Sequence, residues 1–513
     1  MLDNTGAKTG PLSPGDITDE TRPQITGKGE PGNTITILDN GKAIGSTAVD
    51  DNGNWSWTPD VPLAEGSHDI STTETDRAGN VSEPSPGMNI VVDTTPPAGA
   101  EKPPLAMDNV GEKTGPIQSG DVTDDPQPEL SGTGEPGNRI DVWDNGEIIG
   151  SVDVGDDGTW KWKPDAPLTD GDHSLSTTET DKAGNTSKPS PGVDIVVDTV
   201  PPAGSVTPPT ATDNVGEKQG PIKSGDVTDD PQPELSGTGE PGNRIDVWDN
   251  GEIIGSVDVG DDGTWKWKPD APLTDGDHSL STTETDPAGN TSKPSPGVDI
   301  VVDTVPPVGS VTPPTATDNV GEKQGPLQNG DVTDDSQPTL SGTGEPGNRI
   351  DIWDNGKIIG SENVGDDGTW SWKPETPLGE GDHTLSTTET DPAGNTSKPS
   401  GDLNIVVDTT PPVGSDKPPV VTDNYGEKQG PLQNGDVTDD SQPTLSGTGE
   451  PGNRIDIWDN GKIIGSENVG DDGTWSWKPE TPLGEGDHTL STTETDPAGN
   501  TSKPSGDLNI VVD

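Results

Sequence analysis

The sequence predicts an all-β protein, a tandem array of five antiparallel β-sandwiches that form an elongated rod. Three observations predict it. The chain repeats itself every 105 residues without an insertion. Within each copy, short runs that alternate apolar and polar residues are separated by turn sequences. The 70 Gly and 55 Pro among 513 residues exclude long helices, because Gly weakens a helix and Pro interrupts it.

The repeat is clearest in its aromatic and acidic landmarks. The pair Trp55 and Trp57 recurs in every copy, as does the Val-Val-Asp that ends at Asp93. Copies four and five differ only by Val320 against Tyr425. Because the chain begins and stops in phase with the repeat, we read it as a fragment of a longer protein. We expect five domains, at residues 1–93, 94–198, 199–303, 304–408 and 409–513.

The second copy shows the expected elements in order. The proline-rich segment 94–107 is suited to an edge strand. Hairpin formation is expected at Asn145-Gly146, since both residues tolerate the positive φ of a tight turn. Seven short strands in about 100 residues describe a sandwich of immunoglobulin type. With no Cys in the chain, Trp160 and Trp162 are expected to replace the usual inter-sheet disulfide. The remaining strands are expected at residues 128–134, 139–144, 147–154, 159–163, 173–181 and 193–198.

The predicted core of this copy is thin for a domain of this size. Each copy also carries a net charge of roughly −13, so self-repulsion opposes folding. An external stabiliser is therefore expected, and a divalent cation fits because only hard oxygen ligands are present. The expected core residues are Ile140, Val142, Ile149, Val152, Trp160, Trp162, Leu168, Leu175, Val193, Ile195 and Val197.

The overall charge and the motif content exclude several classes of function. At a net charge of −64 the chain repels nucleic acid and anionic lipid, and no apolar stretch reaches the roughly 20 residues of a membrane span. Nucleophile elbows, phosphate-binding glycine loops and HExxH patterns are all missing. We predict that the protein is not an enzyme and has no nucleic-acid partner. The single histidine of each copy, such as His173, is expected to be hydrogen-bonded or on the surface.

The motifs GTGEPGN, DNG, DGTW, TDxAGN and VVDTTPP together resemble the bacterial Ig-like repeats of giant adhesins. Those proteins of Gram-negative bacteria act in biofilm formation and host-cell adhesion and are exported by type I secretion. The resemblance covers all five copies. It implies an Ig-like fold, a rod-like array and an extracellular location on the bacterial cell surface. It also implies calcium ions near the domain junctions that stiffen the array.

Acidic residues in the predicted loops are candidate calcium ligands. The strand ending at Asp198 leads to the pole of the third copy that carries Glu240 and Asp286, and three carboxylates with carbonyls and water suffice for calcium. The alternative is that Asp occupies these loops because it favours turns, as we expect for Asp144, Asp156 and Asp157. The equivalent triads are Asp93, Glu135 and Asp181; Asp303, Glu345 and Asp391; and Asp408, Glu450 and Asp496. A second group, Asp213, Asp226, Asp229 and Asp230, is expected at the opposite pole.

Three interpretations of function remain open from the sequence. In the first, the repeats are the extender of a surface adhesin, with neighbouring repeats as their partners and calcium at the junctions. In the second, each copy binds a host or bacterial glycan or protein through outward tryptophans, unless these pack under a neighbouring loop. In the third, the chain is a passive acidic spacer without specific ion sites. The tryptophans concerned are Trp143, Trp248, Trp353 and Trp458.

Overall fold

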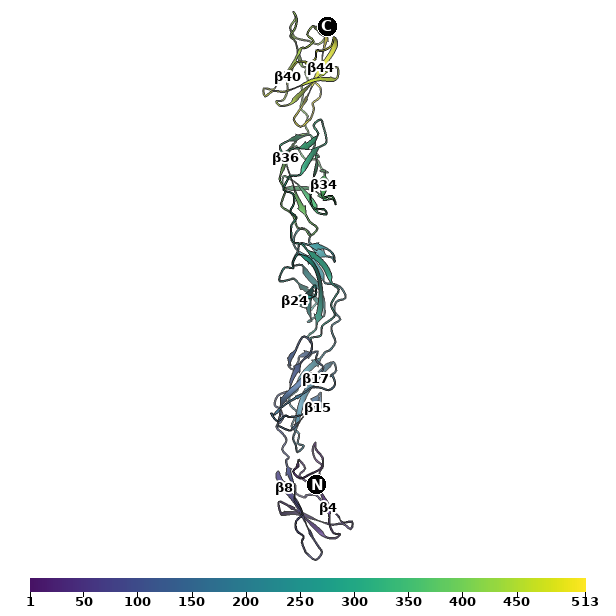
Figure 1. Ribbon diagram of the computed structural model, residues 1–513, viewed down its shortest axis with the longest axis vertical. Helices are drawn as coiled ribbons and strands as arrows, with labels where there is room; N and C mark the ends of the chain where they lie inside the picture. Colours follow the sequence, from purple (N-terminus) through teal and green to yellow (C-terminus); the bar gives the residue numbers. More distant parts are fainter. The chain divides into compact units, whose positions relative to one another are not determined.

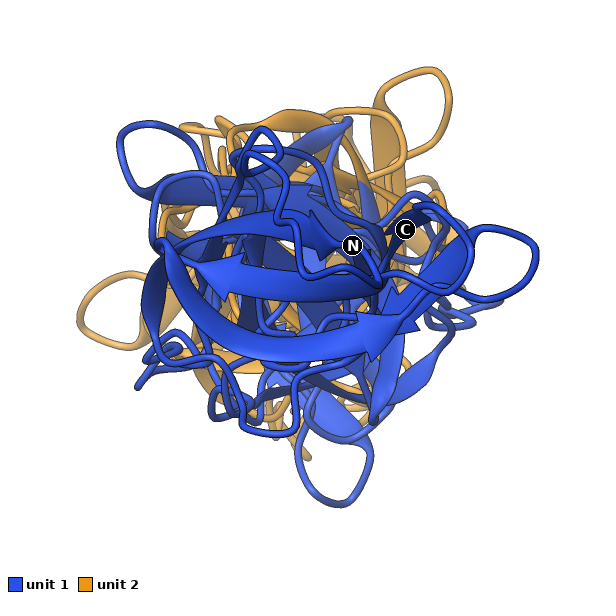
Figure 2. Cartoon of the chain, turned by 90° about the horizontal axis from the view of Figure 1, so that it is seen from below, with its two compact units in different colours: residues 1–209, 236–267, 280–297 blue, residues 210–235, 268–279, 298–513 orange.

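A computed structural model describes residues 1–513 and consists of strands joined by turns and loops, without a helix (Figure 1). The all-β prediction is confirmed. None of its segments is a helix that could cross a membrane. The chain divides into two compact units: residues 1–209, 236–267 and 280–297, and residues 210–235, 268–279 and 298–513 (Figure 2).

Repeat 2 contains nine strands in two sheets. They are β10 (Leu105–Asp108), β11 (Gly115–Ile117), β12 (Val122–Thr123), β13 (Glu129–Thr133), β14 (Arg139–Asp144), β15 (Glu147–Asp153), β16 (Thr159–Trp162), β17 (Gly171–Thr180) and β18 (Val193–Val197). One sheet has the order β11-β10-β13-β16 and the other β12-β18-β17-β14-β15. All pairings are antiparallel except β12 with β18. This is the expected sandwich, with two short strands more than the sequence indicated.

The strands of the other repeats follow the same succession. Repeat 1 has β1 (Leu2–Asp3), β2 (Gly10–Pro11), β3 (Ile17–Thr18), β4 (Ile25–Lys28), β5 (Thr34–Asp39), β6 (Lys42–Ala48), β7 (Asn54–Trp57), β8 (Gly66–Thr75) and β9 (Met88–Val92). Repeat 3 has β19 (Thr210–Asp213), β20 (Gly220–Ile222), β21 (Val227–Thr228), β22 (Glu234–Thr238), β23 (Arg244–Asp249), β24 (Glu252–Asp258), β25 (Thr264–Trp267), β26 (Gly276–Thr285) and β27 (Val298–Val302).

Repeat 4 has β28 (Thr315–Asp318), β29 (Gly325–Leu327), β30 (Val332–Thr333), β31 (Thr339–Thr343), β32 (Arg349–Asp354), β33 (Lys357–Asn363), β34 (Thr369–Trp372), β35 (Gly381–Thr390) and β36 (Leu403–Val407). Repeat 5 has β37 (Val420–Asp423), β38 (Gly430–Pro431), β39 (Asp436–Thr438), β40 (Thr444–Thr448), β41 (Arg454–Asp459), β42 (Lys462–Asn468), β43 (Thr474–Trp477), β44 (Gly486–Thr495) and β45 (Leu508–Val512).

The hairpin between β14 and β15 forms at the predicted Asn145-Gly146 turn. Asn145 has a φ of 48° and Gly146 a φ of 86°, the left-handed values that such a turn requires. The pairing register shifts between Val142 and Trp143, which is a β-bulge. The bulge leaves Ile149 without a paired residue opposite it, and its side chain is only half-buried.

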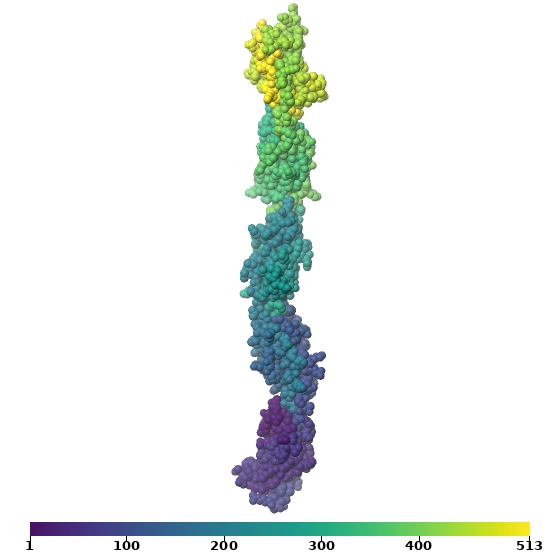
Figure 3. Space-filling view, turned by 180° about the vertical axis from the view of Figure 1, so that it is seen from behind, coloured from purple at the N-terminus to yellow at the C-terminus, as the bar shows by residue number.

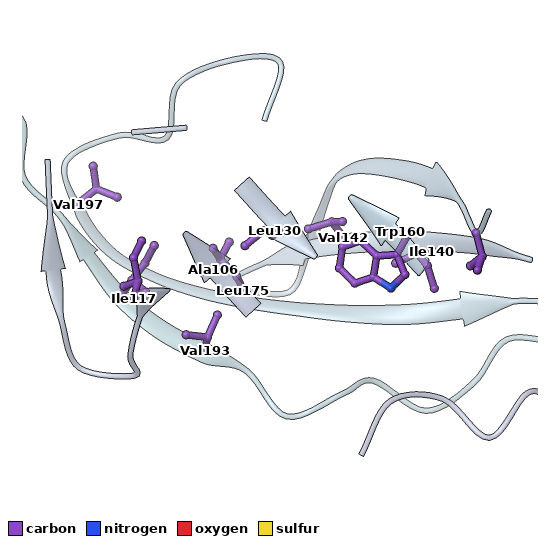
Figure 4. Close-up of a cluster of buried hydrophobic side chains, with 11 residues drawn as sticks. Ala106, Ile117, Leu130, Ile140, Val142, Trp160, Leu175, Val193 and Val197 are labelled. Carbon is purple, nitrogen blue, oxygen red and sulfur yellow. The ribbon is translucent and has the colours of Figure 1, made fainter. Parts of the chain in front are cut away.

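The core of repeat 2 lies between its two sheets (Figure 4). Of the eleven predicted residues, seven are buried: Ile140, Val142, Trp160, Leu175, Val193, Ile195 and Val197. Four predicted core residues, Ile149, Val152, Trp162 and Leu168, are partly buried and pack against the cluster from its margin. Buried residues that the sequence reading missed are Ala106, Ile117, Leu130 and Val154. Three of these come from short or irregular segments where apolar alternation is too brief to detect.

The segment 94–107 does not form the edge strand that the sequence predicted. Only its end forms β10, which lies inside its sheet between β11 and β13. The preceding linker packs against the following repeat, since a Cβ on Gly99 would lie 2.9 Å from the Cβ of Ser187. Ser187, against which the linker lies, is 7% exposed. The linker is thus part of the packing of the repeat that follows it.

The histidine of repeat 2 is buried in a hydrogen-bonded pair. His173 lies with Nδ1 2.7 Å from Asp144 Oδ2 and Nε2 2.7 Å from the Thr169 carbonyl oxygen. Burial opposes its positive charge, but the Thr169 carbonyl and the Asp144 carboxylate favour it more strongly. The net effect raises the pKa of His173 above its ordinary 6.5.

We therefore predict that His173 makes the stability of repeat 2 depend on pH. A raised pKa contributes stability that is complete below about pH 6.5 and is lost as the pH rises through the folded-state value. Replacing His173→Gln should flatten the decline in unfolding free energy that occurs as the pH rises above about 6.5. Denaturant unfolding at a series of pH values measures this. Lys163→Gln, which removes an exposed charge from the same repeat, should leave the slope unchanged. An equal slope in His173→Gln would contradict the prediction.

Candidate metal centre at the repeat junctions

At each junction, a loop of the following repeat is hydrogen-bonded to the linker. Asp286 Oδ1 accepts hydrogen bonds from the backbone N–H groups of Gly289 at 2.8 Å and Asn290 at 3.0 Å. Asn290 Nδ2 donates to Asp286 Oδ2 at 2.9 Å and to the Asp198 carbonyl oxygen at 2.8 Å. The carboxylate of Asp198 caps its own turn by accepting from Val200 N–H at 3.0 Å.

The same hydrogen bond from an asparagine side chain to a linker carbonyl recurs at the other three junctions. Asn185 donates to the Asp93 carbonyl at 2.8 Å, Asn395 to that of Asp303 at 2.7 Å and Asn500 to that of Asp408 at 2.7 Å. The predicted residues Asp93, Asp181, Asp198, Asp286, Asp303, Asp391, Asp408 and Asp496 therefore all lie at junctions. The partner asparagine was not predicted, although its fixed place in TDxAGN could have indicated it.

The predicted glutamates do not join these aspartates. Glu240 is exposed, and its backbone N–H, not its carboxylate, is held by Glu284 Oε1 at 2.6 Å. Glu284 is 6% exposed and also accepts a hydrogen bond from Asn243 at 3.0 Å. It fixes the GEPGN turn from beneath. The equivalent residues Glu135, Glu345 and Glu450 are likewise exposed above the buried Glu179, Glu389 and Glu494.

The second predicted acidic group meets the next repeat. Asp229 Oδ1 is buried and has no hydrogen-bond partner. Burial first, then the charges of Asp213, Asp230 and Asp391, raise the pKa of Asp229 above its ordinary value. Asp391 belongs to repeat 4, so the two predicted groups converge on one junction from neighbouring repeats.

The other residues of this group have turn roles. Asp226 accepts a hydrogen bond from Lys223 N–H at 2.9 Å, and Asp213 accepts one from the Thr228 hydroxyl. Unpartnered, buried Oδ1 atoms recur at the position of Asp229, on Asp19, Asp124 and Asp334. The pKa of each of these carboxyls is also raised, by burial first and by neighbouring aspartates second.

Basic side chains near the acidic residues also form hydrogen bonds between neighbouring repeats. Arg349 donates to Glu217 of the preceding repeat at 2.8 Å and to Asp351 at 2.8 Å. Lys218 donates to the Pro392 carbonyl at 3.0 Å. At the first junction the position of Glu217 is Ala7, so of these two basic contacts only that of the lysine remains, from Lys8 to the Lys182 carbonyl at 3.3 Å. Figure 3 shows the surface of the chain coloured along the sequence.

Carboxylate and carbonyl oxygens are the ligands that calcium prefers, so the donor set of the junction fits this ion. The unpartnered Asp229 oxygen and its raised pKa show uncompensated negative charge at the same place. No group of three or more Asp, Glu or His side chains lies close enough to hold a metal as the side chains stand. An ion would therefore have to draw the carboxylates inward.

The tryptophans of the second predicted site are not freely exposed. Trp143 is half-buried, and its indole N–H donates to Thr178 Oγ1 at 3.0 Å. Trp248, Trp353 and Trp458 each make the equivalent bond at 3.0 Å. The acidic turn residue Asp157 accepts a hydrogen bond from Thr159 N–H at 3.0 Å, as its predicted turn role requires.

Comparison with known proteins identifies the family. A family described as the bacterial Ig-like domain matches residues 3–94, 101–199, 205–304, 310–409 and 416–513, and the chain belongs to it. No curated protein matches the sequence. A crystal structure of a tetra-tandem repeat in the extending region of a large adhesion protein is 20% identical, with 77% of this chain and 98% of that chain covered and a TM-score of 0.26.

Two further solved structures have weaker likeness. Fibronectin(III)-like modules of Clostridium thermocellum CbhA are 17% identical, with 39% of this chain and 93% of that chain covered and a TM-score of 0.25. The BSP domain of a biofilm associated protein is 13% identical, with 81% of this chain and 96% of that chain covered and a TM-score of 0.16.

We predict that Asp334→Asn stabilises the chain when no divalent cation is present. The change removes a buried, unpartnered charge, and burial of an unsatisfied group costs about 1–3 kcal/mol. Thermal unfolding in EDTA should show a higher midpoint for the repeats at this junction. Asp439→Asn is the matched control, because repeat 5 is nearly identical to repeat 4 but Asp439, unlike Asp334, has no buried, unpartnered oxygen. Equal shifts in both variants would contradict a junction effect.

Proposed function

We propose that the chain is a repetitive extender, or stalk, of a large bacterial surface adhesin that acts in cell adhesion and biofilm formation. We propose further that calcium binds at its repeat junctions and stiffens it. The observation that carries the proposal is the recurrence, at each of four junctions, of a buried carboxylate oxygen without a partner beside aspartates of the next repeat.

Near-identity of the copies supports a role in which number matters more than individuality. Copies four and five differ at one position, and the hydrogen bond from an asparagine to a linker carbonyl is present at every junction. Each sandwich adds roughly 35–45 Å if strand rise and loops are counted, so five in line would extend about 200 Å. An extracellular stalk needs that length and not a separate chemistry in each domain.

The residues that would hold calcium at the junction of repeats 3 and 4 are Asp213, Asp229, Asp230 and Asp391, with the carbonyl of Asp303. When bound, the ion supplies positive charge that compensates the buried carboxylates and links oxygens of two repeats. The Asp391–Asn395 loop holds the linker through the hydrogen bond from Asn395 to the Asp303 carbonyl. Self-repulsion keeps the repeats less stable in the low calcium of the cytosol, and millimolar calcium outside the cell stabilises them through binding.

We predict that calcium raises the stability of the intact chain more than magnesium or potassium chloride does. A site filled at about 100 times its Kd contributes roughly 2.7 kcal/mol. Thermal unfolding in EDTA, calcium, magnesium and potassium chloride measures the effect, and small-angle scattering measures the accompanying extension. Asp334→Asn should lose part of the calcium response and Asp439→Asn should keep it.

Two outcomes would contradict the calcium proposal. Equal stabilisation by potassium chloride would mean that screening alone relieves the repulsion, as in a passive acidic spacer. An identical calcium response in Asp334→Asn and Asp439→Asn would place any ion away from the junction.

A further inference from the structure

The first and last strands of a repeat lie inside their sheets and not at the edges. In repeat 2, β10 lies between β11 and β13, and β18 lies between β12 and β17. The same strand order is present in repeats 3, 4 and 5. The edges are formed by β11, β12, β15 and β16, which are internal in the chain of the repeat. A pull on the two ends of a repeat therefore acts first on strands that are paired on both sides.

The chain enters repeat 2 at one end of the sandwich and leaves it at the other. Asn185, in the loop that follows β17, donates to the carbonyl of Asp93, where the linker begins. β18 runs antiparallel to β17, and Val197 at its end pairs with Gly171 at the start of β17. β18 therefore finishes at the opposite end of β17 from the loop that holds the linker. Tension along the chain pulls β18 along its own axis, toward its carboxyl end.

The short strand β12 adds a second row of hydrogen bonds to β18. The two strands are parallel. Val196 N–H donates to the Asp121 carbonyl at 3.0 Å, and Asp198 N–H donates to the Thr123 carbonyl at 3.0 Å. The bond made by Asp198 recurs in every other repeat at 2.9 to 3.1 Å. The equivalent donors are Asp93, Asp303, Asp408 and Asp513.

Hydrogen bonds between strands resist sliding more strongly than peeling. Sliding strains all the bonds of a strand at once, whereas peeling breaks them one after another, because they lie across the strand axis. β17 and β18 pair at five positions, from Gly171 with Val197 to Leu175 with Val193. Val193, Ile195 and Val197 are also buried in the core. For β18 to move under tension, its bonds to β17 and β12 must break together and these side chains must leave the core.

We propose that each repeat resists tension along the chain through shear of its last strand, which is held between two neighbouring strands. This use rests on the proposed extender function, because a stalk between a cell and a surface carries tension. Repeats in series bear the same force, so the weakest repeat unfolds first. Near-identical copies therefore give every repeat a similar resistance, and β12, which has only two residues, has a mechanical role.

Pulling repeat 5 in two directions with optical tweezers tests the proposal. The chain has no Cys, so one introduced Cys takes one handle and the C-terminus takes the other. Val413→Cys, in the linker, replaces a side chain that is 88% exposed, and it loads β45 along its axis. Since an extended residue spans about 3.5 Å, unfolding of the loaded segment lengthens it by about 300 Å. The full chain is used, in EDTA.

Lys462→Cys loads the same strand across its sheet. Lys462 is exposed at the start of β42, next to the turn in which Asn460 donates to the Asp487 carbonyl at 3.0 Å. Asp487 pairs with Val511 near the end of β45. The two handles then pull apart at one end of the sheet, so β45 is peeled from β44 pair by pair. We expect unfolding at a several-fold lower force than with Val413→Cys.

A second variant tests the row of bonds on the other side of β45. Asn434 Oδ1 accepts hydrogen bonds from Asn509 N–H at 2.9 Å and from Asn509 Nδ2 at 3.0 Å. Asn434→Ala should lower the unfolding force along the chain and leave the peeling force unchanged. Gln433→Ala, at the exposed neighbouring position, is the matched control and should leave both forces unchanged.

Two results would overturn the proposal: equal unfolding forces in the two directions, and an Asn434→Ala variant that lowers both forces equally or neither. Thermal unfolding of each variant establishes that it is folded. Because the pulling is done in EDTA, its outcome is independent of the calcium response at the junctions. Failure of the shear mechanism would leave the extender proposal standing, and loss of the calcium response would leave the shear mechanism standing.

Discussion

Burial of like charges where repeats meet is the constraint on which the rest of the structure depends. The Asp229 carboxylate fills the space that the missing Cβ of Gly216 leaves. Asp391 brings a further negative charge from the next repeat. The two repeats are held together in spite of these charges by the hydrogen bond from Asn395 to the Asp303 carbonyl and by the Arg349–Glu217 ion pair. A bound cation that compensates the carboxylates would remove this repulsion and make the junction contribute to the stability of the array.

Sequence identity between copies makes this constraint uniform. A junction uses the first loops of one repeat, the linker, and the loop before the last strand of the next repeat, so near-identical copies generate near-identical junctions. The linker packs on the repeat that follows it, as the close approach of Gly99 to Ser187 shows. A repeat is consequently completed by the linker that precedes it. In such an array, stability is a sum of repeat terms and neighbour terms, and a change at one junction position is multiplied along the chain.

The strands and turns could be predicted because local chemistry determines them. Asn145-Gly146 takes the positive φ values that the turn demands, and Ile140, Val142 and Trp160 lie in the core as their alternation indicates. The features that the sequence did not reveal depend on the pairing register of the strands or on contacts with residues distant in the sequence. A bulge after Val142 places Ile149 at the margin of the core, and no local pattern reveals it. The buried Glu284 beneath the predicted Glu240 was not foreseen either, because loop position is visible in the sequence and burial is not.

The junctions and the edges of the sheets place different constraints on one sandwich. Junction residues lie on end loops, where they contact residues 92 to 174 positions away, so a change there must be accommodated by two repeats. Residues of the edge strands β33 and β34 and of the loop 374–379 belong to a single repeat. They share no residue with the Asp391–Asn395 loop that holds the linker. In the proposed extender, these edges of the sheets are thus where the sequence can vary without altering a junction.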